Sequence, residues 1–126
     1  MNPTADTDFD DWLIATFRDA GSFTMLFVLV GITPTRVELL RSAYLHVIGD
    51  ELRWPEMERV FAGAGVEWSG VVFFRAGIEG LVRDDEARSR LGALVRKMNE
   101  DRTIIRDGEF FNRDGLRLRL DDEPRH

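Results

Sequence analysis

The chain has 126 residues, a length that fits one domain with a single hydrophobic core. Its 23 acidic residues outnumber 17 basic residues and give a formal charge of −6, which disfavours strong non-specific binding to nucleic acid. The absence of cysteine excludes disulfides and thiolate chemistry, and the longest apolar run is far too short to span a bilayer.

The N-terminal part predicts a polar segment followed by a helix. Residues 1–7 lack hydrophobic periodicity and are expected to be disordered, and they carry no basic region typical of a signal peptide. From Asp8 onward, apolar side chains recur at helical spacing, and Gly21 is placed to end the helix. We therefore expect the folded domain to begin at residue 8 and the protein to reside in the cytoplasm.

The middle of the chain predicts a buried strand and two helices. Residues 24–30 are continuously apolar, which is typical of a strand covered on both faces. Thr33 followed by Pro34 is a strong helix-start signal, and it predicts a helix over residues 33–49. A second such start at Trp54 predicts a short helix ending near residue 65.

The C-terminal half predicts one more strand, a long helix and a meander. Residues 71–74 form an apolar strand, and the acidic residues from Asp84 open a helix of about four turns. Two Asp-Gly pairs then separate three short strands at residues 103–106, 109–113 and 116–120. In the last of these, leucine and arginine alternate, so the leucines are expected to face the core.

These elements predict a single mixed domain of the α/β (α+β) class over residues 8–120, followed by a charged tail at residues 121–126. The expected order is α-β-α-α-β-α-β-β-β, with helices packed on a mixed sheet of about five strands. The first two strands are expected to be parallel because a long helical connection separates them. The last three are expected to form an antiparallel meander.

Residues suited to catalysis are few. The chain has one lysine, one tyrosine and two histidines, so a non-enzymatic role is favoured while the enzyme question stays open. His46, with Asp50 four residues later, is a candidate general base, but no third ligand accompanies the pair, so neither a metal site nor a cofactor is predicted. Gly31 and Thr33, at the predicted strand-to-helix turn, are candidates for binding a small molecule.

The aromatic and arginine side chains of the predicted meander suggest an interaction surface. Edge strands are natural docking and dimerisation sites. We expect a small cytosolic interaction or regulatory domain that binds a protein partner or forms a homodimer. A second alternative is nucleic-acid binding by the arginines, which the acidic residues between them disfavour. The candidate interface residues are Trp54, Trp68, Phe110, Phe111, Arg113, Arg117 and Arg119.

Overall fold

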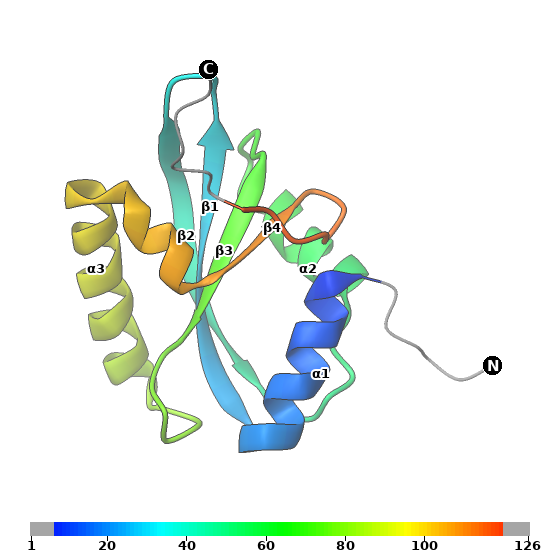
Figure 1. The fold of residues 1–126 in the computed structure, drawn as a ribbon. Helices are drawn as coiled ribbons and strands as arrows, with labels where there is room; N and C mark the ends of the chain where they lie inside the picture. Colours follow the sequence, from blue (N-terminus) through cyan, green and yellow to red (C-terminus); the bar gives the residue numbers. More distant parts are fainter. Residues whose placement is uncertain (1–6, 120–126) are drawn as a thin grey trace.

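The computed structural model describes residues 7–119 and has one antiparallel sheet with helices on both faces (Figure 1). The sheet has four strands in the order β2-β1-β3-β4. The mixed α/β class is thus confirmed. The elements are α1 (Asp8–Ala20), β1 (Phe23–Ile32), β2 (Val37–Val47), α2 (Trp54–Ala62), β3 (Gly70–Arg75), α3 (Asp84–Glu100), the 3-10 helix η1 (Arg102–Asp107) and β4 (Glu109–Asn112).

Strand β1 lies inside the sheet, and its first eight residues are buried, as its continuous apolar sequence predicts. Its side chains alternate between two cores. Phe27 and Leu29 join the core beneath α1 and α2, whereas Val28 and Val30 join the core beneath α3 and η1. Figure 1 shows α3 on one side of the sheet and α1 and α2 on the other.

Helix α1 begins and ends where the sequence indicates. The Thr7 side chain accepts a hydrogen bond from the Asp10 N–H, so Thr7 caps the helix. Gly21 follows it with φ +75°, a conformation that glycine adopts readily. Phe9 and Leu13 are fully buried against aromatic rings of the sheet and of α2. Helices α2 and α3 also begin at the residues predicted for them, Trp54 and Asp84.

The predicted helix over residues 33–49 is wrong, because this segment forms a turn and strand β2. The Thr33 N–H donates to the Arg36 carbonyl at 2.9 Å, and the Arg36 N–H donates to the Thr33 hydroxyl at 3.1 Å. Pro34 therefore occupies the second position of a tight turn, a place that suits proline as well as a helix start does. Pairing of β2 with β1 outweighs the helix propensity of the segment.

The predicted parallel pairing of the first two strands is also wrong, since β1 and β3 pair antiparallel. The extra strand β2 explains the reversal. It runs back along β1, and the α2 connection then returns the chain to the other end of the sheet. Strand β3 consequently runs in the same direction as β2 and opposite to β1.

The predicted C-terminal meander contains one strand of the sheet, β4. Residues 103–106 lie in η1, whose first turn is capped by the Asp101 carboxylate accepting from the Thr103 N–H at 3.0 Å. The segment after β4 makes an isolated bridge between Phe111 and Arg117, and Leu116 is exposed. Among the described residues the sheet therefore has four strands rather than five, and the predicted element order is corrected accordingly.

The predictions for residues 1–6, for Leu120 at the end of the predicted strand at 116–120, and for the tail at 121–126 lie outside the described residues. Between residues 7 and 119, no helix is both long and apolar enough to cross a membrane.

Candidate interaction surface

The aromatic residues of the predicted interface lie in the core. Trp54 is 3% exposed and Trp68 is 6% exposed, and the Trp54 indole N–H donates to the Arg113 carbonyl at 3.1 Å. Phe111 is buried beneath α1 and α2, whereas Phe110 is buried on the α3 side. These four rings stabilise the domain and leave little aromatic surface for a partner.

The arginines near these rings have neighbours within the chain. The Arg113 guanidinium carbon lies 5.1 Å from the centroid of the Trp68 ring, and that of Arg117 lies 5.2 Å from the centroid of Phe111. Arg117 also forms an ion pair with Glu109. Arg119 is exposed. Apart from Arg119, the arginines predicted to meet a partner cover the edges of the aromatic core.

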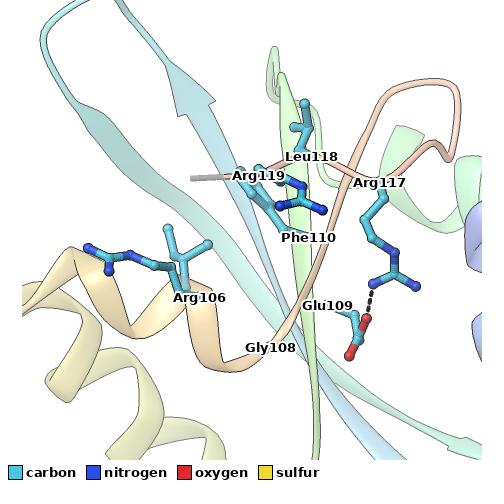
Figure 2. Close-up of a pocket in the computed structure, with 8 residues that line it drawn as sticks. Arg106, Gly108, Glu109, Phe110, Arg117, Leu118 and Arg119 are labelled. Atoms are coloured by element: carbon cyan, nitrogen blue, oxygen red, sulfur yellow. Dashed lines mark hydrogen bonds and ion pairs between the residues drawn. The ribbon is translucent and has the colours of Figure 1, made fainter. Parts of the chain in front are cut away.

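A pocket of about 390 Å³ lies between η1, β4 and the segment at residues 117–119. Figure 2 shows the Arg117 side chain turned toward Glu109, while the Arg106 side chain extends away from both of them. The guanidinium groups of Arg106 and Arg117 thus do not converge on one point, as joint binding of a single anion would require. The lining residues are Ile105, Arg106, Gly108, Glu109, Phe110, Arg117, Leu118 and Arg119.

The outer edge of β4 is covered by the chain itself. The Leu118 N–H donates to the Phe110 carbonyl at 2.7 Å, and the Asn112 N–H donates to the Leu116 carbonyl at 2.8 Å. Backbone groups that would otherwise bind another strand are thereby used. The C-terminal segment closes this edge rather than offering it.

The opposite edge, formed by β2, is open, and the hydrogen bonds of β1 show which of its groups face outward. The carbonyls of Thr24 and Val30 accept from the N–H groups of Ala76 and Ser69, both at 2.8 Å. Even-numbered residues of β1 therefore turn their backbone groups toward β3. Since successive residues of a strand turn theirs to opposite sides, the odd-numbered residues bond to β2.

The residues of β2 that lie opposite even-numbered β1 positions turn their N–H and C=O groups away from the sheet. The register places Ser42 opposite Val28 and Tyr44 opposite Leu26. Ser42 is exposed and Tyr44 is half-buried. The outward-facing residues at this end of β2 are Ser42, Tyr44 and His46.

A β-bulge limits the regular part of this edge. Leu29 pairs with Arg41 whereas Val30 pairs with Leu39, so Leu40 is the extra residue. The side chains of Arg41 and Arg102 donate to the carbonyls of Leu40 and Val37, at 2.8 and 2.7 Å. These bonds use backbone acceptors at the bulge and before it. The regular open edge therefore consists of residues 41–47.

Grooves flank this open edge on both faces of the sheet. The groove against α3 has a volume of about 570 Å³ and the groove against α2 about 400 Å³, and Ser42 and Ala43 line both. Neither lining contains an acidic side chain, although the chain as a whole is acidic. The first groove is lined by Ser42, Ala43, Tyr44, Arg88, Leu91, Gly92 and Val95; the second by Phe27, Leu29, Arg41, Ser42, Ala43, Val60, Phe61, Gly63 and Ala64.

His46 lies on β2, in a hydrogen-bonded chain that joins the edge strand to α3. Its Nδ1 is 2.8 Å from the Thr24 hydroxyl oxygen and its Nε2 is 2.7 Å from a carboxylate oxygen of Asp84. The Thr24 hydroxyl also accepts from the Val82 N–H at 3.0 Å. The hydrogen bond with His46, foremost, lowers the pKa of Asp84.

The hydrogen-bonded side chains of Thr24, His46 and Asp84 have the chemical groups of a proton relay, but the Thr24 hydroxyl is not accessible to a substrate. Thr24 is completely buried, so no substrate atom can approach its oxygen. What the three side chains do is position the first turn of α3 against the end of β2, and they thereby help to define the groove between these elements.

The small-molecule site predicted near the first strand is not assembled. Gly31 and Thr33 lie at the hairpin end of β1, whereas His46 is opposite Thr24, near the other end. The seven residue steps from Thr24 to Gly31 span about 23 Å at 3.3 Å per residue. Asp50 lies in the loop before α2. Within residues 7–119 no cluster of three His, Asp or Glu side chains is arranged to hold a metal ion.

Comparisons with protein-family models, curated proteins and solved structures give no match, so the geometry alone carries the functional argument. The sequence prediction missed the open edge because residues 33–49 were interpreted as a helix. One signal could have revealed it. From Ser42 to Val47 polar and apolar residues alternate, with tyrosine among the polar ones, and period-two alternation is typical of a strand.

Proposed function

We propose that this protein is a non-enzymatic, cytoplasmic interaction domain that binds an extended polypeptide by strand addition along β2. One observation carries the proposal: the outward N–H and C=O groups of Ser42 and Tyr44 lie between two grooves without acidic side chains. This observation supports a docking surface on β2 rather than on the C-terminal segment. A cysteine-free sequence supports a reducing compartment such as the cytoplasm.

Strand addition uses both features of the surface. An added strand bonds to the outward backbone groups of β2, and each such hydrogen bond contributes about 0.5–1.5 kcal/mol net. Its alternate side chains then point toward opposite faces, where the two grooves can accept them. The backbone bonds supply affinity and the grooves supply preference for particular side chains. The apolar side chains in both linings favour an added strand that carries apolar residues at alternate positions.

Other classes of function have less support. A small-molecule site would need Gly31 and Thr33 to act with His46, which lies near the far end of β1. Nucleic-acid binding would need a continuous basic face, but Arg117 is paired with Glu109 and the chain carries a net charge of −6.

The experiment selects binders from a displayed library of nine-residue peptides and compares two variants at one position. Ser42→Pro removes an outward N–H while leaving the bonds between β1 and β2 intact, and Ser42→Ala keeps that N–H. We expect selected peptides to bind the wild type and Ser42→Ala alike, and to bind Ser42→Pro at least tenfold more weakly. Peptides that bind all three proteins equally would refute docking at β2.

A further inference from the structure

We infer that the strand which occupies the β2 edge is β2 of a second copy of this chain, paired antiparallel about a two-fold axis at Tyr44. The inference rests on the proposed strand-adding function and names its partner. An antiparallel pair of identical strands has two-fold symmetry, so one edge can serve as its own complement. A second copy of the chain therefore already carries the strand edge that this mode of binding requires.

The length of the regular edge determines the register. Residues 41–47 follow the bulge, and Tyr44 is the middle one of the seven. With Tyr44 opposite Tyr44 of the partner subunit, Ser42 lies opposite the partner's His46 and Ala43 opposite the partner's Leu45. The two side chains of every pair then lie on the same face of the sheet, and all seven residues pair with a residue of the second copy. A centre at Ser42 would place the bulge residue Leu40 opposite Tyr44, on the wrong face.

The charges on this edge permit self-association of an acidic protein. In the register centred on Tyr44, Arg41 lies opposite Val47 of the partner subunit, so no like charges of β2 itself are directly opposed. The two groove linings contain no Asp or Glu, and Asp84, which lies at the His46 end of this edge, is hydrogen-bonded to that imidazole. The charged group nearest the axis in the α3 groove is Arg88, whose guanidinium donates to the Tyr44 hydroxyl at 3.2 Å.

Helix α3 has apolar surface that such a dimer would cover. Of its apolar side chains Ala87 and Met98 are buried, while Leu91 and Val95 are half-buried beside the groove. Because the two-fold axis is perpendicular to the sheet, both copies of α3 lie on the same face of a continuous eight-stranded sheet. A stable dimer buries roughly 800 Å² per partner, about a tenth of the 7690 Å² surface of this chain. The α3 side of the groove would supply part of that area.

The absence of native cysteine allows a direct test by cross-linking. At the two-fold axis, facing residues in a hydrogen-bonded pair have Cα atoms about 5.5 Å apart, within the range that a disulfide spans. Two copies of residue 42 would lie about 13 Å apart, because four residues separate 42 from 46. Tyr44→Cys should therefore form a covalent dimer under mild oxidation at low micromolar concentration. Ser42→Cys is the matched control and should not.

Light scattering on the unmodified chain provides a second measurement that does not depend on the cysteine variants. We expect twice the monomer mass of 14.5 kDa, and a dimer dissociation constant at least tenfold larger for Ser42→Pro than for Ser42→Ala. Cross-linking of Ser42→Cys as efficient as that of Tyr44→Cys, or a dimer that Ser42→Pro leaves unchanged, would overturn the inference. A wild type that stays monomeric while selected peptides bind β2 would overturn it but leave the proposed function intact.

Discussion

Replacing Thr24 with valine should separate the end of β2 from α3 while keeping the shape of the side chain. The Thr24 hydroxyl is fully buried, lies 2.8 Å from His46 Nδ1 and accepts from the Val82 N–H at 3.0 Å. Valine occupies almost the same volume but has no hydroxyl, so both neighbours lose a hydrogen-bond partner. The perturbation therefore tests the hydrogen bonds of this position rather than its packing.

The expected loss follows from those two bonds. Each contributes about 0.5–1.5 kcal/mol net, so Thr24→Val should lower the free energy of unfolding by about 2 kcal/mol. For a domain of this length, that loss corresponds to a decrease in Tm of roughly 6–10 °C. The free energies are measured by urea denaturation followed by tryptophan fluorescence, because Trp54 and Trp68 are buried in the core.

Thr24→Ser is the matched control, because it keeps the hydroxyl and removes only a methyl group, at a cost of about 1 kcal/mol. NMR of the His46 ring should retain the signature of a hydrogen-bonded Nδ1 in Thr24→Ser and lose it in Thr24→Val. If Thr24→Val is as stable as the wild type within about 0.5 kcal/mol, the hydroxyl does not join these elements and the reasoning is refuted.

Three further predictions concern stability. The hydrogen bond with His46 lowers the pKa of Asp84, so this bond stabilises the fold above the unfolded-state pKa near 4 and is lost as the pH falls through the lower folded-state pKa. The urea midpoints of Asp84→Asn and the wild type should therefore converge below about pH 4. A constant difference between the two midpoints down to about pH 2.5 would contradict this. The buried Asp10 carboxylate accepts a hydrogen bond from the Trp54 backbone N–H at 2.8 Å. Asp10→Ala should therefore lower the free energy of unfolding by about 2–3 kcal/mol, and Asp10→Asn should lower it clearly less. Equal losses for the two variants in urea denaturation would argue against that bond. A Cβ at Gly108 would lie 2.7 Å from a backbone carbonyl oxygen of β3, so Gly108→Ala should lower the free energy of unfolding by about 1–3 kcal/mol, and an unchanged thermal midpoint would show that the strand moves aside without cost.

Much of the fold could be predicted from local sequence signals that are compatible with only one kind of secondary structure. A continuously apolar run identified the strand at residues 24–30, and proline after Trp54 together with the acidic residues from Asp84 identified two helix starts. Each of these signals depends only on residues within the element or next to it. The polar residue before proline at position 34 is different, since it suits a tight turn as well as a helix start.

The strand order and the position of the open edge could not be predicted, because both depend on pairing between distant residues. Ala43 and Leu45 lie in a strand because β1 pairs with them, and within residues 33–49 the short alternation at residues 42–47 competes with a helix-start signal at Thr33 and Pro34. Because the sequence predicts a helix over residues 33–49, it predicts the docking surface at the C-terminal strands instead of at β2. There, Phe110 and Phe111 point to opposite faces of the sheet, and both rings are buried in a hydrophobic core.

The most direct test of the open edge is amide hydrogen exchange along β2, resolved by residue and repeated over a range of protein concentrations. At high dilution, we expect the N–H groups of Ala43 and Leu45, which bond to β1, to exchange slowly, and those of Ser42 and Tyr44 to exchange fast. As the concentration rises, exchange at Ser42 and Tyr44 should slow toward that of their neighbours. Slow exchange of these two amides at every dilution would mean that the edge is already covered. Fast exchange at every concentration, and with every selected peptide, would mean that no strand is added to β2.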